Sequence, residues 1–134
     1  MHSSASQAPP EAWTRRRVAE IARAAGSKAR EISVLYCGDT RMRSLNRRFR
    51  RKDRTTDVLA FPAGQGEGGF LGDIAISVPY ASRQASRAGL TPRREIDRLL
   101  LHGVLHLMGY DHETDRGEMD ALEAKLRTRL GLRS

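Results

Sequence analysis

Apolar and polar positions follow two different rhythms along the first fifty residues. Apolar residues recur at helical spacing over residues 11–25, and Gly26 is placed to end that helix. The run EISVLY over residues 31–36 is rich in β-branched and aromatic types, which predicts a strand. Asp39 or Thr40 can cap a second helix. Its predicted buried side consists of three apolar residues at helical spacing: Met42, Leu45 and Phe49.

The rest of the chain predicts two strands and then three helices. The strands cover residues 57–61, which end at Pro62, and residues 70–78, where apolar residues alternate. The predicted helices run from Pro79 to Gly89, from about Pro92 to about Met108, and from about Thr114 to about Leu130. Thr91 can cap the middle helix, and Gly109 lies just past its end. The last helix has one apolar stripe, made of Met119, Leu122, Leu126 and Leu130.

This order of elements favours an α+β fold, with a small mixed β-sheet covered by helices. A length of 134 residues suits one domain and is too short for two ordinary ones. Residues 1–10, MHSSASQAPP, are small, polar and proline-containing, which predicts a flexible tail. We therefore predict a single domain over residues 11–134.

The charge of the chain favours an anionic partner. Lys and Arg number 24 against 16 Asp and Glu, so the net charge is +8. Most of the basic residues are arginines, whose planar guanidinium suits phosphate better than the ammonium of lysine. Nucleic acid is the partner that this composition predicts.

The cysteine count and the hydropathy favour a cytoplasmic protein. The single cysteine, Cys37, cannot form an internal disulfide, which fits a reducing compartment. Because it follows an apolar stretch, we interpret it as a strand-end residue and not as a nucleophile. No apolar run approaches the roughly 20 residues of a membrane span, and the N-terminus has no secretory signal.

Three of the four histidines lie within eleven residues, in the segment LLHGVLHLMGYDHE. His102 and His106 are four apart in the longest predicted helix, so both rings lie on one helix face, one turn apart. Gly109 can adopt the left-handed conformation that turns the chain and brings His112 back. Three imidazoles suit Zn²⁺ and leave a fourth position for water, which is typical of a catalytic site. Nickel or another divalent ion would also accept these ligands.

The same spacing occurs in zinc proteases with the pattern H-E-x-x-H-x-x-G-x-x-H. In those enzymes the glutamate beside the first histidine is the general base, and this chain has Gly103 there. Peptide hydrolysis, with its poor leaving group, depends strongly on that base. A metalloprotease is therefore a disfavoured alternative.

A basic cluster over residues 41–56, RMRSLNRRFRRKDRTT, indicates phosphate binding instead. Half of these side chains belong to a solvated helix face. Arg50 or Lys52, just before the predicted strand DVLAF, can point into a cleft and clamp a phosphodiester. Few aromatic residues accompany the cluster, so we expect recognition of backbone and shape rather than base stacking.

These segments together resemble one known family. FRRKDRTTDVLAFP, LGDIAIS and HGVLHLMGYDH, in this order, resemble the YbeY family of bacterial endoribonucleases, also called rRNA maturation factors. The resemblance covers about residues 35–126. It implies cleavage of single-stranded RNA, maturation of the 3′ end of 16S rRNA and a role in ribosome quality control. The implied partners are ribosomal RNA, the small ribosomal subunit and ribosome-assembly proteins.

The resemblance also implies roles for individual residues. The zinc ligands of the family fall on His102, His106 and His112. The arginine that serves catalysis or RNA binding falls on Arg50, and we predict that His102 is catalytic as well. The further residues with implied or predicted roles are Lys52, Arg47 and Arg54 in RNA binding, Asp53 in the same segment, and Asp73 and Asp111 as groups that could orient a metal ligand.

Three points stay open in the sequence. Thr55 and Ala60 differ from the usual family residues, and the tail MHSSASQAPP is a poor match for the strand that usually precedes the first helix. The general base is not identifiable from sequence: it could be metal hydroxide or the 2′-hydroxyl of the RNA. A competing hypothesis is a zinc-stabilised ribosome-assembly protein that binds rRNA without cutting it.

Overall fold

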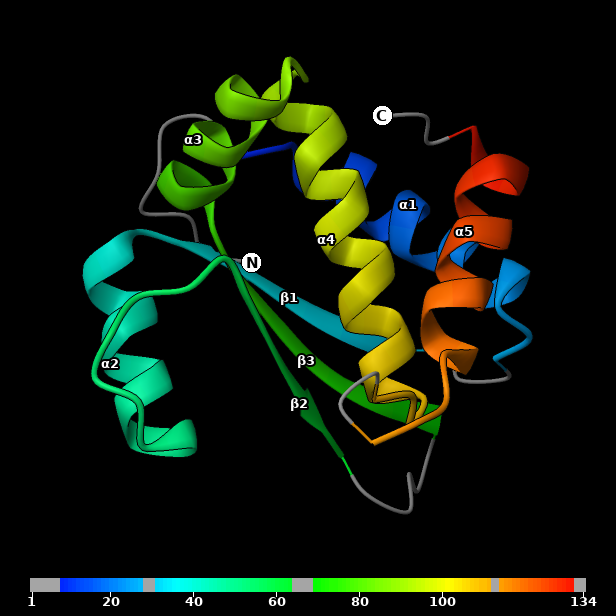
Figure 1. The fold of residues 1–134 in the computed structure, drawn as a ribbon, viewed down its shortest axis with the longest axis horizontal. Helices are drawn as coiled ribbons and strands as arrows, with labels where there is room; N and C mark the ends of the chain where they lie inside the picture. Colours follow the sequence, from blue (N-terminus) through cyan, green and yellow to red (C-terminus); the bar gives the residue numbers. More distant parts are fainter. Residues whose placement is uncertain (1–7, 28–30, 64–68, 112–113, 132–134) are drawn as a thin grey trace.

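Helices cover both faces of a small sheet in the computed structural model, which describes residues 8–27, 31–63, 69–111 and 114–131 (Figure 1). The sheet consists of β1 (Glu31–Cys37), β2 (Val58–Pro62) and β3 (Phe70–Ser77) in the order β1-β3-β2. Strand β1 is parallel to β3, and β2 is antiparallel to it. The predicted α+β fold with a mixed sheet is confirmed.

The described residues also form five helices: α1 (Glu11–Ala24), α2 (Asp39–Arg50), α3 (Val78–Ala88), α4 (Pro92–Leu107) and α5 (Glu118–Leu130). Their order along the chain is the predicted one. Of the predicted tail, residues 8–10 are described, and there Ala8 packs against the core while Pro9 is buried. The tail over the remaining residues, which lie outside the described ranges, stays a prediction.

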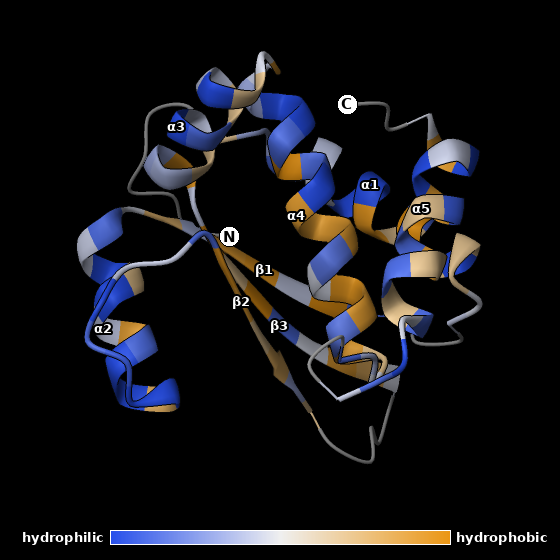
Figure 2. Cartoon of the chain, in the orientation of Figure 1, coloured by the Kyte–Doolittle hydropathy of each residue, from blue (hydrophilic) through white to orange (hydrophobic). Residues whose placement is uncertain are grey.

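The alternation of side chains along the strands explains the two covered faces. Ile74 and Ile76 of β3 belong to the main core, which α1, α4 and α5 complete. Ala75, between them in sequence, points to the other face and belongs to a smaller core with Met42 of α2. Figure 2 shows the apolar residues concentrated along the strands and on α4. The sheet therefore separates α2 from α4.

Cys37 ends β1, as the sequence predicted, and it is buried. Burial raises the pKa of its thiol, although Arg41 acts in the opposite direction. A buried thiol with a raised pKa is a poor nucleophile.

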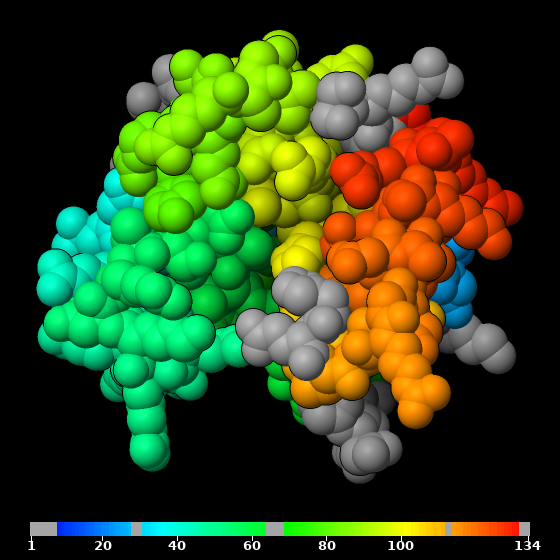
Figure 3. Space-filling view, viewed as in Figure 1, coloured from blue at the N-terminus to red at the C-terminus, as the bar shows by residue number. Residues whose placement is uncertain are grey.

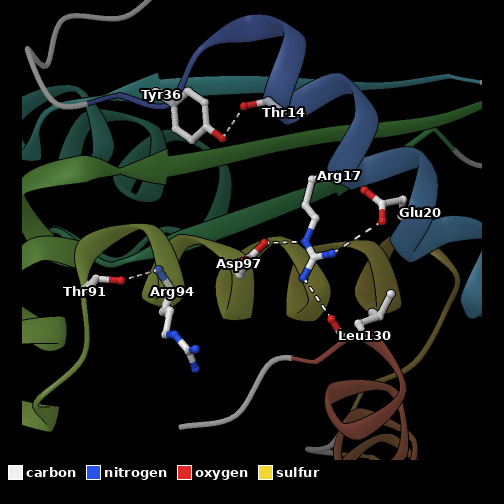
Figure 4. A network of polar contacts seen from close by, with 8 residues as sticks. All are labelled: Thr14, Arg17, Glu20, Tyr36, Thr91, Arg94, Asp97 and Leu130. Atoms are coloured by element: carbon white, nitrogen blue, oxygen red, sulfur yellow. Dashed lines mark hydrogen bonds and ion pairs between the residues drawn. The ribbon is translucent and has the colours of Figure 1, made fainter.

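Helix α4 is fixed at its beginning and along its length. Thr91 caps it by accepting a hydrogen bond from the backbone N–H of Arg94 at 3.2 Å, as predicted. Arg17 of α1 donates from Nε to Oδ1 of Asp97 at 2.6 Å and from Nη2 to the carbonyl of Leu130 at 3.4 Å (Figure 4). One guanidinium therefore ties α1 to both α4 and α5.

Gly103 lies where α4 packs closely on β3. A Cβ at this position would lie 2.9 to 3.1 Å from side-chain atoms of Ile74. The position next to His102 therefore faces the core. A glutamate there would be directed into β3, which agrees with the absence of the protease base from this chain.

Three details of the sequence prediction were wrong. Neither Asp39 nor Thr40 caps α2, whose N-cap is Gly38 without a side-chain hydrogen bond. Helix α5 begins at Glu118 and not near Thr114, because the carboxylate of Asp115 accepts from the N–H groups of Gly117 and Met119 and holds a turn there. Phe49, expected on the buried side of α2, is 57% exposed. Its spacing from Met42 and Leu45 is that of a buried helix position. It lies, however, on the last turn of α2, beside the edge strand β2.

Candidate metal centre and basic loop

Two of the predicted metal ligands converge on one point at the end of α4. The Nε2 atoms of His102 and His106 lie 3.1 Å apart, and their rings meet edge to face with centroids 4.6 Å apart. The spacing of four residues on one helix produces this arrangement, as the sequence predicted. Gly109 follows with a φ of 101°, so the chain turns where the prediction requires it.

The two imidazoles fit a zinc ion. Two nitrogens bound at about 2.0–2.1 Å to one tetrahedral ion lie about 3.3 Å apart, close to the observed separation. His112, the predicted third ligand, lies outside the described residues. Within the described ranges, no group of three or more His, Cys, Asp or Glu side chains is arranged to hold an ion. The metal site therefore stays a prediction that the first two ligands support.

Glu123 of α5 adds a contact that the sequence analysis missed. Its Oε1 lies 2.6 Å from Nδ1 of His102, on the side of the ring opposite to Nε2. A carboxylate at Nδ1 fixes the tautomer that leaves Nε2 available to a metal, and this pairing is common in metal sites. A sequence signal did exist: Glu123 lies beside Leu122 on the stripe between Met119 and Leu126, where an apolar residue would be expected.

The predicted RNA-binding residues lie at the end of α2 and in the loop that follows. Their side chains are exposed: Arg47, Arg50, Lys52 and Arg54. The buried side chain of Asn46 donates from Nδ2 to the carbonyl of Arg54 at 2.9 Å. Arg51 ends the helix in the left-handed conformation, with a φ of 58°. Asn46 therefore anchors a basic loop whose cations face solvent.

Asp39 holds the other end of this loop. Its Oδ1 accepts from Ser77 at 2.8 Å and from Thr55 at 3.3 Å, and Oδ2 pairs with Arg83 at 2.8 Å. Burial alone would raise the pKa of Asp39, but the hydrogen bonds from Ser77 and Arg83 outweigh burial and lower it.

Asp39→Asn should lower the free energy of unfolding by about 1 kcal/mol at neutral pH, a figure reduced for the partial exposure of the carboxylate. The pKa of Asp39 is lower in the folded protein than in the unfolded chain. The Asp39 carboxylate therefore stabilises the fold above the unfolded pKa of about 3.9, and this stabilisation is lost as the pH falls through the folded pKa. The difference between the two proteins should therefore shrink below about pH 4. Urea unfolding across pH measures it, with Asp53→Asn as an exposed control; an equal difference at every pH would contradict this account.

Three acidic residues that the sequence analysis placed near the metal or in the RNA-binding segment make other contacts. Asp53 pairs with Arg43 at 2.8 Å. The backbone carbonyl of Asp111 accepts from the N–H groups of Thr114 and Asp115, so this residue shapes the turn after α4. Asp73 is exposed and lies opposite Phe61 in the sheet, on the face that carries α2. The structure therefore does not bring Asp73 together with the histidines, which lie on α4.

Two cavities of the described residues lie away from these side chains. A cavity of about 690 Å³ lies between α1 and β1, and one of about 340 Å³ lies between α3, α4 and Asp57. Neither is lined by a predicted metal or RNA ligand. Figure 3 instead shows the surface hollowed between the segment after α2 (blue-green) and α4 (yellow).

Comparisons with known proteins agree with this geometry. Residues 3–131 match the family described as endoribonuclease YbeY. A protein of that name from Solibacter usitatus is 54% identical over 101 residues, which are 75% of this chain and 67% of the relative. Another from Koribacter versatilis is 52% identical over 113 residues, 84% of this chain and 73% of the relative. About a third to a quarter of the length of these relatives therefore lies outside the match.

A solved structure supports the fold. The solution structure of a Thermotoga maritima protein superimposes with a TM-score of 0.58 and 27% identity, over 89% of this chain and 85% of that one. The described part of this chain contains no helix long and apolar enough to cross a membrane. With a family match over nearly its whole length and close relatives of the same name, the chain belongs to the YbeY family of endoribonucleases.

Proposed function

We propose that this chain is a zinc-dependent endoribonuclease that cuts single-stranded RNA. The observation that carries the proposal is the convergence of the Nε2 atoms of His102 and His106, with Glu123 on the other nitrogen of His102. The chain that carries these two histidines belongs to an endoribonuclease family. A bound zinc ion supplies Lewis-acid chemistry and an activated water at such a site.

The residues of the chain have two tasks, metal binding and RNA binding. His102 and His106 hold the metal, and His112 is the proposed third ligand. Glu123 orients the ring of His102 through its contact with Nδ1. Arg50, at the end of α2, binds the phosphodiester and offsets the charge that grows during cleavage, and Arg47, Lys52 and Arg54 attract the RNA backbone.

The biological role that we propose rests on the resemblance to the family. We propose that the RNA is ribosomal, that cleavage matures the 3′ end of 16S rRNA, and that the protein serves ribosome quality control. Its partners are then ribosomal RNA, the small subunit and ribosome-assembly proteins, in the cytoplasm. The net charge of +8 supports an anionic partner of this kind.

A cleavage assay on matched RNAs tests the proposal. The substrate is an RNA with the 3′ end of a 16S rRNA precursor, offered as a single strand and annealed to its complement. We expect the zinc-loaded protein to cut the single strand, the chelated protein to be inactive, and added zinc to restore cleavage. Arg50→Ala should lower the cleavage rate while the zinc content stays unchanged.

Two outcomes decide against this function. Equal cleavage by the chelated protein would exclude metal dependence, and tight binding without cleavage would favour the assembly-factor hypothesis. A 2′-deoxy nucleotide at the cut site separates two chemistries of the enzyme: only internal attack by the 2′-hydroxyl requires that group.

A further inference from the structure

We propose that Phe49 is a stacking platform for one base of a single-stranded RNA, next to the arginines that bind its phosphates. The inference rests on the proposed function and adds how this site distinguishes a single strand from a duplex. It replaces the sequence-based expectation that base stacking is unimportant here.

Phe49 has an unusual position for a large apolar side chain. It is 57% exposed, and among the described residues no other large hydrophobic side chain is exposed. One exposed apolar residue is ordinary by itself. Phe49, however, lies on the last turn of α2, between Arg47 and Arg48 on one side and Arg50 and Arg51 on the other. The apolar ring of Phe49 is thus exposed among neighbouring arginines.

The ring of Phe49 is held in place. It meets the ring of Phe61 edge to face, with centroids 5.2 Å apart and planes at 68°. Phe61 in turn packs on the smaller core, together with Leu35 and Leu45. A supported ring loses little conformational freedom when a base stacks on it, which favours binding.

Arg48 supplies the charge that a stacked nucleotide needs. Its guanidinium carbon lies 5.8 Å from the centroid of the Phe49 ring, near the outer limit of a cation–π contact. Because Arg48 is exposed, the contact is weak and its side chain can turn to a phosphate. Base on ring and phosphate on arginine is the usual combination of sites that bind single strands.

The platform is connected to the metal centre through the end of β2. A Cβ at Gly72 would touch both the carbonyl oxygen of Phe61 and the Cδ2 of Leu107, so these three residues are neighbours. Leu107 directly follows His106. The aromatic pair lies on the α2 face of the sheet and the histidines on α4, at the same end of edge strand β2.

This arrangement suits a single strand better than a duplex. A flexible strand can bend round the edge of the sheet and place one base on Phe49 while its phosphates follow the arginines. The bases of a duplex are paired and stacked on each other, so they are not available to the ring. Asp73, exposed beside Phe61, repels phosphate and keeps the backbone on the arginine side.

Oligonucleotide binding by the zinc-loaded protein tests the platform. The probes are single-stranded RNA oligomers with all bases, an oligomer of equal length with abasic positions, and the corresponding duplex, each checked on a gel for intactness. Phe49→Ala should weaken binding of the single strand about 5- to 100-fold, as expected for one stacked base. It should leave the abasic oligomer, the duplex and the salt dependence unchanged.

Further variants separate stacking from charge and from general apolar contact. Phe49→Tyr should bind like the wild type, and Phe49→Leu, which keeps apolar volume without a π face, should bind like Phe49→Ala. Arg48→Gln should lower the slope of log affinity against log salt by about 1 for all probes. Phe49→Trp in a Trp13→Phe background should show fluorescence quenching by the single strand alone.

The outcomes distinguish failure of the platform from failure of the proposed function. If Phe49→Ala binds and cuts the single strand like the wild type, the platform is wrong and the ribonuclease stands. If it weakens the abasic oligomer as much as the complete one, its effect is not stacking and the platform is again wrong. If the wild-type protein binds no single-stranded RNA, both proposals fall.

Discussion

His106→Ala should remove the metal from the protein and lower RNA cleavage by at least about 10³-fold, since a catalytic metal contributes several kcal/mol to transition-state stabilisation. The substitution removes one of the two nitrogens that lie 3.1 Å apart at the end of α4. Without His106, only His102 and the proposed third ligand His112 remain, and two histidines do not hold zinc tightly. Metal content by mass spectrometry and cleavage of a single-stranded RNA measure the two effects on the same preparations.

The fold should survive this substitution, so loss of activity is interpretable. His106 is only partly buried, and the core contacts of α4 come from its apolar neighbours, such as Leu105 and Leu107. Arg94→Ala, an exposed change at the other end of the same helix, is the matched control and should keep both metal and activity. Cleavage at the wild-type rate by metal-free His106→Ala would exclude the metal centre and point to a contaminating nuclease.

The fold and the pairing of His102 with His106 could be predicted because they depend on local patterns. Helical spacing places His102 and His106 together whatever surrounds them. Local chemistry also sets the helix limits: the Thr91 side chain caps the beginning of α4, and Gly89 ends α3. The same holds for Ile74 and Ile76, whose alternation selects one face of the sheet.

What could not be predicted depends on which elements meet in space. Phe49 has the phase of a buried residue, and only its position over edge strand β2 leaves it exposed. In the sequence, Asn46 is one of several polar residues of a basic helix. Its role as an anchor depends on the loop, which brings the carbonyl of Arg54 to its side chain. Asp73 was assigned toward the metal from the resemblance, whereas the strand alternation directs it to the other face.

Glu123 is the clearest case, because 21 residues separate it from His102. The packing of α5 against α4 brings the two side chains to 2.6 Å. Once the contact is known, its chemistry is simple: an anion on Nδ1 orients the ring and raises the basicity of Nε2 toward a metal. The sequence contains Glu123, but its contact with His102 is seen only in the fold.

Glu123→Gln should therefore weaken zinc binding about 10- to 100-fold, and Glu123→Ala should weaken it at least as much, the range found when such supporting carboxylates are removed. The amide of Gln can still accept from Nδ1, but it carries no negative charge, so the ring becomes a weaker ligand. Competition with a chromophoric chelator measures the affinity without relying on cleavage. At saturating zinc, most of the lost activity should return in Glu123→Gln, because His102 and His106 are intact.

Asp120→Asn is the matched control for this prediction. It removes the same charge from the same helix, but its side chain is exposed, so zinc affinity should not change. Equal affinity of Glu123→Gln and the wild type would mean that the contact with His102 is structural and does not tune the metal site. A loss in both variants would instead assign the effect to the overall charge of α5. The design thus separates the contact at Nδ1 from long-range electrostatics, which salt screens over about 10 Å at 0.1 M ionic strength.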